Sequence, residues 1–152
     1  MVSVPERAAV TDLVINALLT LGYPVGDQVK PWEAGWSNDD PNTGDWTPYL
    51  VVKTTQMSQD RSAAGVFDQV CRDWVATYMV QAWGVSVEQV ESIVTDAASV
   101  SWPVSAVFGT GSVWSFQRGL VDSVSGLRRD TRVNPNLWYS HMTLACSLRR
   151  TR

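Results

Sequence analysis

Two segments of the chain repeat apolar residues at helical spacing. Residues 4–21 carry an apolar stripe of Val10, Leu13, Val14, Ala17, Leu18 and Leu21. Residues 87–99 carry a stripe of Val87, Val90, Ile93, Val94 and Ala97. Apolar residues three and four positions apart share one face of a helix, which packs against a core. We therefore expect two amphipathic helices, with Thr11, Asp12, Asn16 and Thr20 on the outer side of the first.

Capping signals accompany both helices. Ser3 and Glu6 have the spacing of a capping box, and Ser86 and Gln89 repeat it before the second helix. In such a box each of the two side chains accepts a hydrogen bond from an otherwise unpaired backbone N–H group. Gly22 follows the first stripe and is typical of a helix end.

Four other segments favour β-strands. Residues 49–54 predict a short strand, and residues 112–121 another. Residues 67–83 predict a long strand whose two faces are both fairly apolar, which is typical of a central strand covered on both sides. The clearest alternation lies in residues 137–148, where one face holds Trp138, Met142, Leu144, Cys146 and Leu148 and the other Tyr139, His141, Thr143, Ser147 and Arg149. A strand of this length spans roughly 40 Å.

The order of these segments indicates an α+β fold. We expect an antiparallel or mixed β-sheet with the two amphipathic helices packed on one side and a long C-terminal strand. A chain of 152 residues fits a single domain spanning residues 1–152. Between the predicted elements, residues 57–64 are polar and turn-like, residues 100–111 irregular with room for a brief strand, and residues 122–135 a polar loop.

Residues 22–47 have no helical or strand period and predict a long loop rich in Trp, Pro and Gly. The loop contains Trp32, Trp36 and Trp46, three of the eight tryptophans of the chain. Eight are more than a core of this size normally uses, and large aromatics outside regular elements favour contact with another chain. We expect the loop to dock on a neighbour, with these three tryptophans as candidate interface residues.

Charge is distributed unevenly along the chain. The formal net charge is −3, but the segment from Arg118 to the end holds seven arginines against two aspartates. Arg128, Arg129 and Arg132 lie together in its polar loop. Guanidinium groups bind carboxylate or phosphate in bidentate geometry. A solvated loop is the simpler interpretation; as a functional one we favour pairing with acidic segments of an adjacent subunit over nucleic-acid binding.

The sequence offers little for catalysis or for metal binding. His141 is the only histidine and has no nucleophile or second ligand at a defined spacing. Asp39, Asp40 and Asp45 do not follow a calcium-loop pattern. The Gly109–Ser112 run lacks the lysine and the following helix of a phosphate-binding loop. We expect no enzymatic activity, no metal and no cofactor.

The remaining sequence features concern the thiols and the cellular compartment. Cys71 and Cys146 are expected to be buried free thiols. No apolar run approaches the ~20 residues of a membrane span, and the first residues do not resemble a signal peptide. We expect a protein that is cytosolic when made and has no membrane partner.

One passage resembles a known family. The residues from Trp74 to Glu91, a strand that ends at Gly84 and leads into the second helix, look like the central strand–Gly–helix passage of tail terminator proteins (tail completion or minor tail proteins) of long-tailed bacteriophages. Within this family, the passage most resembles the proteins of phages that infect actinobacteria. The resemblance extends to the first helix ending in Leu-Gly, the Pro/Trp/Gly loop before a Tyr-led strand, the Arg-bearing loop and the strand from Leu137 to Leu148.

The resemblance implies a structural virion protein without enzymatic activity or cofactor. Such proteins form a ring, usually hexameric, at the head-proximal end of the tail tube, assembled in the host cytoplasm. The ring stops polymerisation of the tube protein and joins the tail to the head connector, and DNA only passes through its lumen. The alternatives are another neck or tail component (a head-closure or adaptor protein, or a tube subunit) or, from another class, a small enzyme or ligand-binding domain that uses His141 or the arginine loop.

Overall fold

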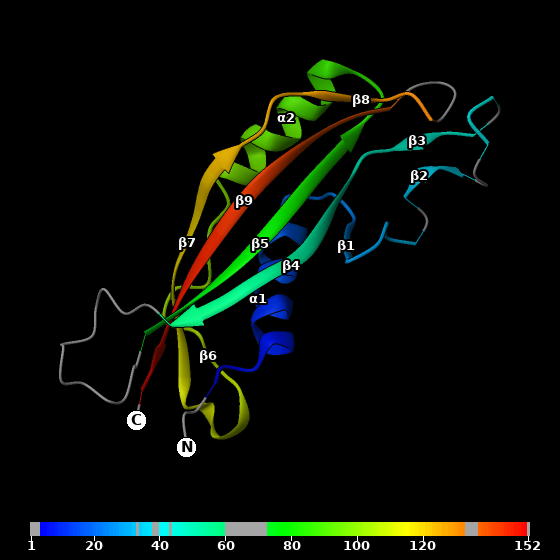
Figure 1. Cartoon of the computed structure of the whole chain (residues 1–152). Helices are drawn as coiled ribbons and strands as arrows, with labels where there is room; N and C mark the ends of the chain where they lie inside the picture. The colour runs from blue at the N-terminus through cyan, green and yellow to red at the C-terminus, as the bar shows by residue number, and fades with distance from the viewer. Residues whose placement is uncertain are drawn as a thin grey trace.

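The computed structural model describes residues 4–32, 34–37, 40–42, 44–59, 73–132 and 137–151. Its elements follow one another along the chain as drawn in Figure 1: α1 (Arg7–Leu19), β1 (Val25–Asp27), β2 (Gly35–Trp36), β3 (Trp46–Thr47), β4 (Tyr49–Gln59), β5 (Asp73–Gly84), α2 (Val87–Ala98), β6 (Val107–Phe108), the 3₁₀ turn η2 (Thr110–Ser112), β7 (Trp114–Val124), β8 (Arg128–Asp130) and β9 (Leu137–Arg150).

The main sheet has seven strands and is mixed. Its order is β1-β4-β5-β9-β7-β6, and β8 pairs with β9 beyond the end of β7. All the pairs are antiparallel except β1 with β4. The central strand β9 pairs with β5 along twelve consecutive positions. The predicted α+β fold with a long C-terminal strand is confirmed.

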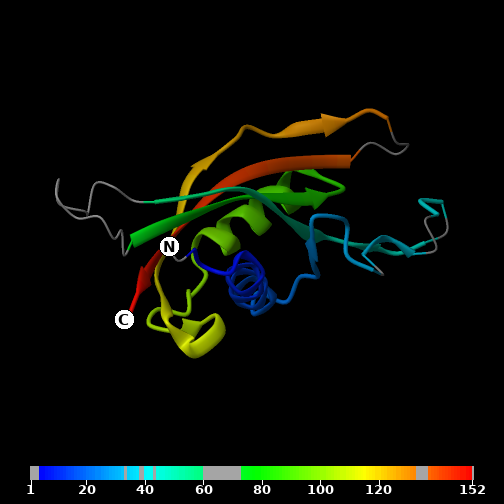
Figure 2. The same cartoon turned by 60° about the horizontal axis from the view of Figure 1, so that its bottom comes forward.

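Both helices lie on the same face of the curved sheet. Figure 2 shows α1 and α2 side by side beneath the strands, and no described element covers the middle of the opposite face. The strands turn alternate residues toward the helices, as in the predicted pattern of the last strand. The core between the layers is built from Val10, Val14, Leu18, Leu50, Val52, Ala76, Tyr78, Val80, Val90, Ile93, Phe116, Met142, Leu144, Cys146 and Leu148.

Helix α2 matches its prediction, while α1 departs from it in two respects. The Ser86 hydroxyl accepts a hydrogen bond from the Gln89 N–H group and caps α2. At α1 the capping residue is Glu6 without a side-chain cap, and the predicted partner Ser3 lies outside the described residues. Thr11 was expected on the outer side but is buried, because its hydroxyl bonds the Tyr78 hydroxyl at 3.1 Å and the Arg7 carbonyl at 2.9 Å.

Two strand predictions need correction. Strand β4 continues to Gln59, past the predicted end at residue 54, and includes the start of the segment predicted as a turn. Strand β5 begins at Asp73, while residues 60–72 lie outside the described part of the chain. The helices cover only one face of β5: Val75, Thr77 and Met79 on the other face stay half-buried. The described part of the chain supplies no second layer over this strand. Fairly apolar residues alone do not show whether the same chain provides one.

The predicted loops contain additional strands. Residues 22–47 hold β1, which joins the main sheet, and the β2–β3 hairpin, so the prediction of a structureless loop was wrong. Residues 122–135 hold β8, which pairs with the start of β9. These strands are two or three residues long, too short to produce a periodic pattern in the sequence.

Candidate subunit interface

The sheet face opposite the helices lacks a covering layer in its middle among the described elements. We call it the open face; its central positions are Val75, Thr77, Met79, Gln81 and Trp83 of β5 and Tyr139, His141, Thr143, Ala145 and Ser147 of β9. These side chains are uncharged or, for His141, weakly basic. Covering these central positions costs little, since no permanent charge among them needs to be desolvated. Lys53 and Arg118 flank them, in register with Met79 and Ser147.

A row of rings crosses one end of this face. We call Trp36, Trp46, Tyr49, Trp83, Tyr139 and His141 the aromatic row. Successive ring centroids are 5.2, 6.0, 6.2, 4.6 and 5.3 Å apart. The Tyr49–Trp83 and Trp83–Tyr139 pairs are stacked. Pairs at these separations add roughly 0.5–1.5 kcal/mol each beyond their buried area. The row therefore fixes the β2–β3 hairpin to β4, β5 and β9.

A small second core lies beneath the hairpin end of the row. Ala34, Tyr49 and Val51 are buried there, with Trp46 and Trp83 packed against them. The Trp46 indole N–H donates a hydrogen bond of 2.8 Å to the Gln89 side-chain oxygen on α2. Two of the three tryptophans predicted to contact a neighbour, Trp36 and Trp46, are thus held partly within their own chain.

The third of these tryptophans behaves differently. Trp32 lies in the connection between β1 and β2 with 90% of its surface exposed. Of the eight tryptophans, Trp74 and Trp114 are buried, and the remaining five are half-buried. An indole is rarely left in water, which makes Trp32 the outlier.

The three predicted arginines lie near one another and have different surroundings. Arg132 donates two hydrogen bonds to the Asp130 carboxylate, at 3.0 and 3.2 Å, and lowers the pKa of Asp130 below its usual range. The Arg129 guanidinium lies 5.9 Å from the centroid of the Trp138 ring. Arg128 is exposed and pairs in register with Tyr139 on the open face. Arg132 already has a carboxylate partner in its own chain, whereas Arg128 lies beside the open face, where a neighbour could contact it.

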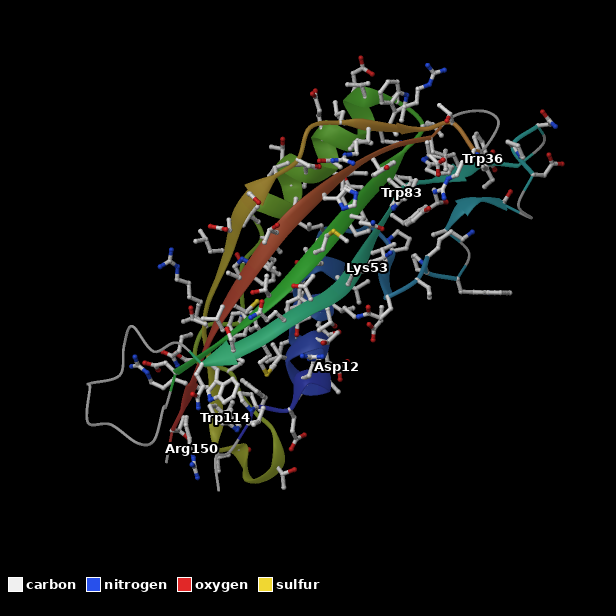
Figure 3. The ribbon with its side chains drawn as sticks, in the orientation of Figure 1. Asp12, Trp36, Lys53, Trp83, Trp114 and Arg150 are labelled. Atoms are coloured by element: carbon white, nitrogen blue, oxygen red, sulfur yellow. The ribbon has the colours of Figure 1, made fainter. Side chains whose placement is uncertain are left out.

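Electrostatics near the aromatic row favour neutral rings. Burial lowers the pKa of His141, and the positive charges of Arg128 and Lys53 lower it further. Its Nδ1 atom lies 2.8 Å from the Met79 sulfur. Burial, together with the negative charge of Asp130, raises the pKa of Tyr49 to about 12. At neutral pH these groups are uncharged, so a partner would cover them without desolvating an ion. Figure 3 places Lys53 and Trp83 on the neighbouring strands β4 and β5.

A groove opens at the far edge of the sheet, between α2 and the connection from β7 to β8. We call it the edge groove; it has a volume of about 360 Å³ and is lined by Glu91, Val94, Thr95, Val124, Ser125, Gly126, Leu127 and Ser140. Val94, Val124 and Leu127 form an apolar wall, and Glu91 supplies a carboxylate at its side. The sequence did not point to this groove, because its walls come from segments about 30 residues apart.

The sites considered for catalysis and ligand binding have structural roles in the described residues. Thr110 donates hydrogen bonds from its N–H group and its hydroxyl to the Glu6 carboxylate. In the Gly109–Ser112 turn, whose sequence was compared above with a phosphate-binding loop, these donors are therefore already bound to a carboxylate of the same chain. The Asp40 carboxylate accepts the Asn42 N–H group in the hairpin turn. Within these residues no group of three or more His, Cys, Asp or Glu side chains could hold a metal ion. No described helix is long and apolar enough to cross a bilayer.

Of the two cysteines predicted to be buried free thiols, the structure describes only Cys146. Cys146 is free and fully buried in the core, and burial raises the pKa of its thiol to about 12. The prediction of a buried thiol is confirmed at this position. Cys71 lies outside the described residues.

Comparison with known proteins gives limited information. No family model matches the chain, and no curated protein matches it. One solved structure, whose name states no function, is 18% identical and covers 94% of this chain and 92% of its own, with a TM-score of 0.46. This similarity is too distant to indicate a function.

Proposed function

We propose that the protein is a tail terminator of a long-tailed bacteriophage. It forms a ring, expected to be hexameric, at the head-proximal end of the tail tube. There it stops polymerisation of the tube protein and joins the tail to the head connector. It is a component of the virion, assembled in the host cytoplasm, and DNA only passes through the lumen of the ring. It has no enzymatic role in this proposal.

The observation that carries the proposal is the open face. Among the described residues, the sheet of seven strands has helices on one face only, and the middle of the other bears neutral side chains bordered by the aromatic row. Surfaces of this kind are typical of contacts between chains. We propose that neighbouring proteins of the particle cover this face.

The sheet edges support the same interpretation. β1 pairs with only three residues of β4, from Leu50 to Val52, and β6 with only Trp114 and Ser115 of β7. Among the described residues the rest of both outer edges has no strand partner. Two different unpaired edges suit a head-to-tail contact between copies, and such contacts generate rings when the rotation closes.

The test is the state of assembly. Light scattering coupled to size-exclusion chromatography and negative-stain images should reveal uniform rings at high concentration or in the presence of the tube protein, with rings capping short tubes. A species that stays monomeric even with tube protein present would refute the proposal. Long tubes formed by the protein alone would identify a tube subunit instead.

A matched pair of variants tests the open face itself. Thr143→Glu places a charge at its centre and should reduce assembly, because a buried unpaired carboxylate is costly. Asn16→Glu adds the same charge on the exposed side of α1, at a position remote from that face, and serves as control. Equal assembly of the two variants would show that the open face is not covered in the particle.

A further inference from the structure

An exposed indole and the partly apolar edge groove lie at opposite edges of the sheet. Trp32 follows β1, the strand at one end of the sheet order, while the edge groove lies beside β7 near the other end. Figure 1 shows β1 and the hairpin on one side of the molecule and α2 with the β7–β8 connection on the other. Strands β4, β5 and β9 lie between the two features in the sheet order, so the groove is open to the indole of another copy.

We propose that Trp32 of one copy inserts into the edge groove of the next copy. This inference rests on the proposed ring and names the contact that would build it. The groove volume of about 360 Å³ lies within the range of roughly 300–1,000 Å³ that holds small organic groups. Val124 at its rim is 47% exposed, so the groove offers apolar surface that a ring would cover.

The polar groups at the two features are complementary. An indole that becomes buried needs an acceptor for its N–H group, and Glu91 presents a carboxylate at the side of the groove. Lys30 lies two residues before Trp32; it is exposed, and its ammonium donates to the Ala34 carbonyl at 3.0 Å. Glu88 and Glu91 are exposed on α2. A cation beside the indole and two carboxylates beside the groove favour this orientation of the copies over the reverse.

The geometry also accounts for a closed assembly. Each copy carries one indole and one groove on different surfaces, so each binds one neighbour on either side. Contacts of this heterologous kind extend from copy to copy until the ring closes. A central aromatic anchor in a desolvated pocket is the usual position of a binding hot spot.

Two single variants remove the two halves of the contact. Trp32→Ala deletes the indole, and Val29→Ala, at an exposed position of the same connection, is its control. Thr95→Arg fills the groove, since the new side chain can pair with Glu91 one helical turn earlier. Asn16→Arg adds the same charge on the exposed side of α1, away from the groove lining, and is its control.

We expect Trp32→Ala and Thr95→Arg to raise the concentration needed for half-assembly roughly 30-fold or more, the effect of a hot-spot residue. Both controls should assemble like the wild type. Circular dichroism and the melting temperature confirm that all four variants are folded, which is expected because the altered side chains are exposed.

A mixing experiment identifies the head-to-tail contact. Trp32→Ala retains the groove and Thr95→Arg retains the indole, so an equimolar mixture has one intact contact and should form dimers and no rings. Mass photometry distinguishes monomers, dimers and rings. Mixtures that stay monomeric would overturn the inference.

The failure of this inference differs from failure of the proposed function. Wild-type rings together with unchanged rings of Trp32→Ala would refute the contact and leave the ring proposal standing. A wild-type protein that never assembles, with or without tube protein, would refute the ring and the contact with it. Binding of free indole in the groove of the wild type, without any effect of Trp32→Ala on assembly, would identify a ligand pocket instead and also refute the contact.

Discussion

Trp46 and Gln89 join the β2–β3 hairpin to helix α2. The indole N–H of Trp46 donates to Gln89 Oε1 at 2.8 Å, and the Val85 N–H group donates to the same oxygen at 3.0 Å. One side-chain oxygen thus holds the hairpin, the end of β5 and the first turn of α2 in place. Gly84 directly precedes this junction, and a Cβ atom there would lie 2.9 Å from Gln89 Oε1, so the chain has no space for a side chain at this position.

Replacing Gln89 by Leu should destabilise the protein by about 1–3 kcal/mol, because two donors lose their acceptor. Urea unfolding followed by tryptophan fluorescence measures the change. Glu91→Gln alters an exposed residue on the same helix and should change stability by less than about 0.5 kcal/mol. If the two variants unfold at the same urea concentration, the hydrogen bonds of Gln89 contribute nothing.

The hydroxyl groups of Tyr78 and Thr11 form a buried polar contact between β5 and α1. Removing one hydroxyl or the other should lower the free energy of unfolding by different amounts. Tyr78→Phe leaves Thr11 with its second partner, the Arg7 carbonyl, and should cost about 0.5–1.5 kcal/mol. Thr11→Val leaves the fully buried Tyr78 hydroxyl without its partner, and should cost about 1–3 kcal/mol. Urea midpoints of both variants test this order, and the reverse order would contradict it.

Gly119 allows the close approach of Trp102 to the sheet. A Cβ atom at Gly119 would lie 2.6 Å from two ring atoms of Trp102, so the indole would have to move. Gly119→Ala should therefore destabilise the fold by roughly 1–3 kcal/mol, the usual cost of overpacking. Gly126→Ala is the matched control, because a Cβ atom there meets nothing within 4 Å. Calorimetry of both variants would reveal whether Trp102 has room to adjust.

The sequence predicts the large elements of this fold because each repeats apolar residues at a regular spacing over many positions. Burial in strand β9 alternates from Ser140 to Leu148, and of the predicted face Met142, Leu144, Cys146 and Leu148 are buried while Trp138 is half-buried. Helix α2 has both its apolar stripe and its Ser86 cap. The β2–β3 hairpin gave no such signal, because it has only two residues in each strand; the rings of Trp36 and Trp46 pack together across it.

The candidate interface could be predicted only in part for a related reason. The Trp composition pointed to Trp32, Trp36 and Trp46 together, and the structure leaves 90% of the Trp32 surface exposed. The same argument could not separate Trp32 from Trp46, whose partner Gln89 lies 43 residues away. Trp83 and Tyr139 stack at 4.6 Å only because β5 and β9 pair in register. Contacts across strands depend on which residues of the two strands pair. The apolar period within a single strand gives no information about that register.

His141 makes stability depend on pH in a direction that its surroundings determine. Burial and the charges of Arg128 and Lys53 lower its pKa in the folded state below the unfolded value of about 6.5. Between these two pKa values the unfolded chain binds more protons than the folded one. Stability therefore falls as the pH decreases from about 6.5 to the lower, folded pKa, and below that value the loss is complete.

The variant His141→Gln should lack this part of the pH dependence. We expect the stability difference between wild type and variant, measured by urea unfolding at pH 7.5 and pH 5, to shift in favour of the variant at the lower pH. Carboxylates titrate equally in both proteins and cancel. Because His141 is the only histidine of the chain, its ring signal in an NMR titration gives the folded pKa directly. Arg128→Gln should raise that pKa, since it removes one of the two neighbouring positive charges. A folded pKa at or above 6.5 in the wild type would show that the ring accepts its proton freely, and that the open face has no preference for the neutral form.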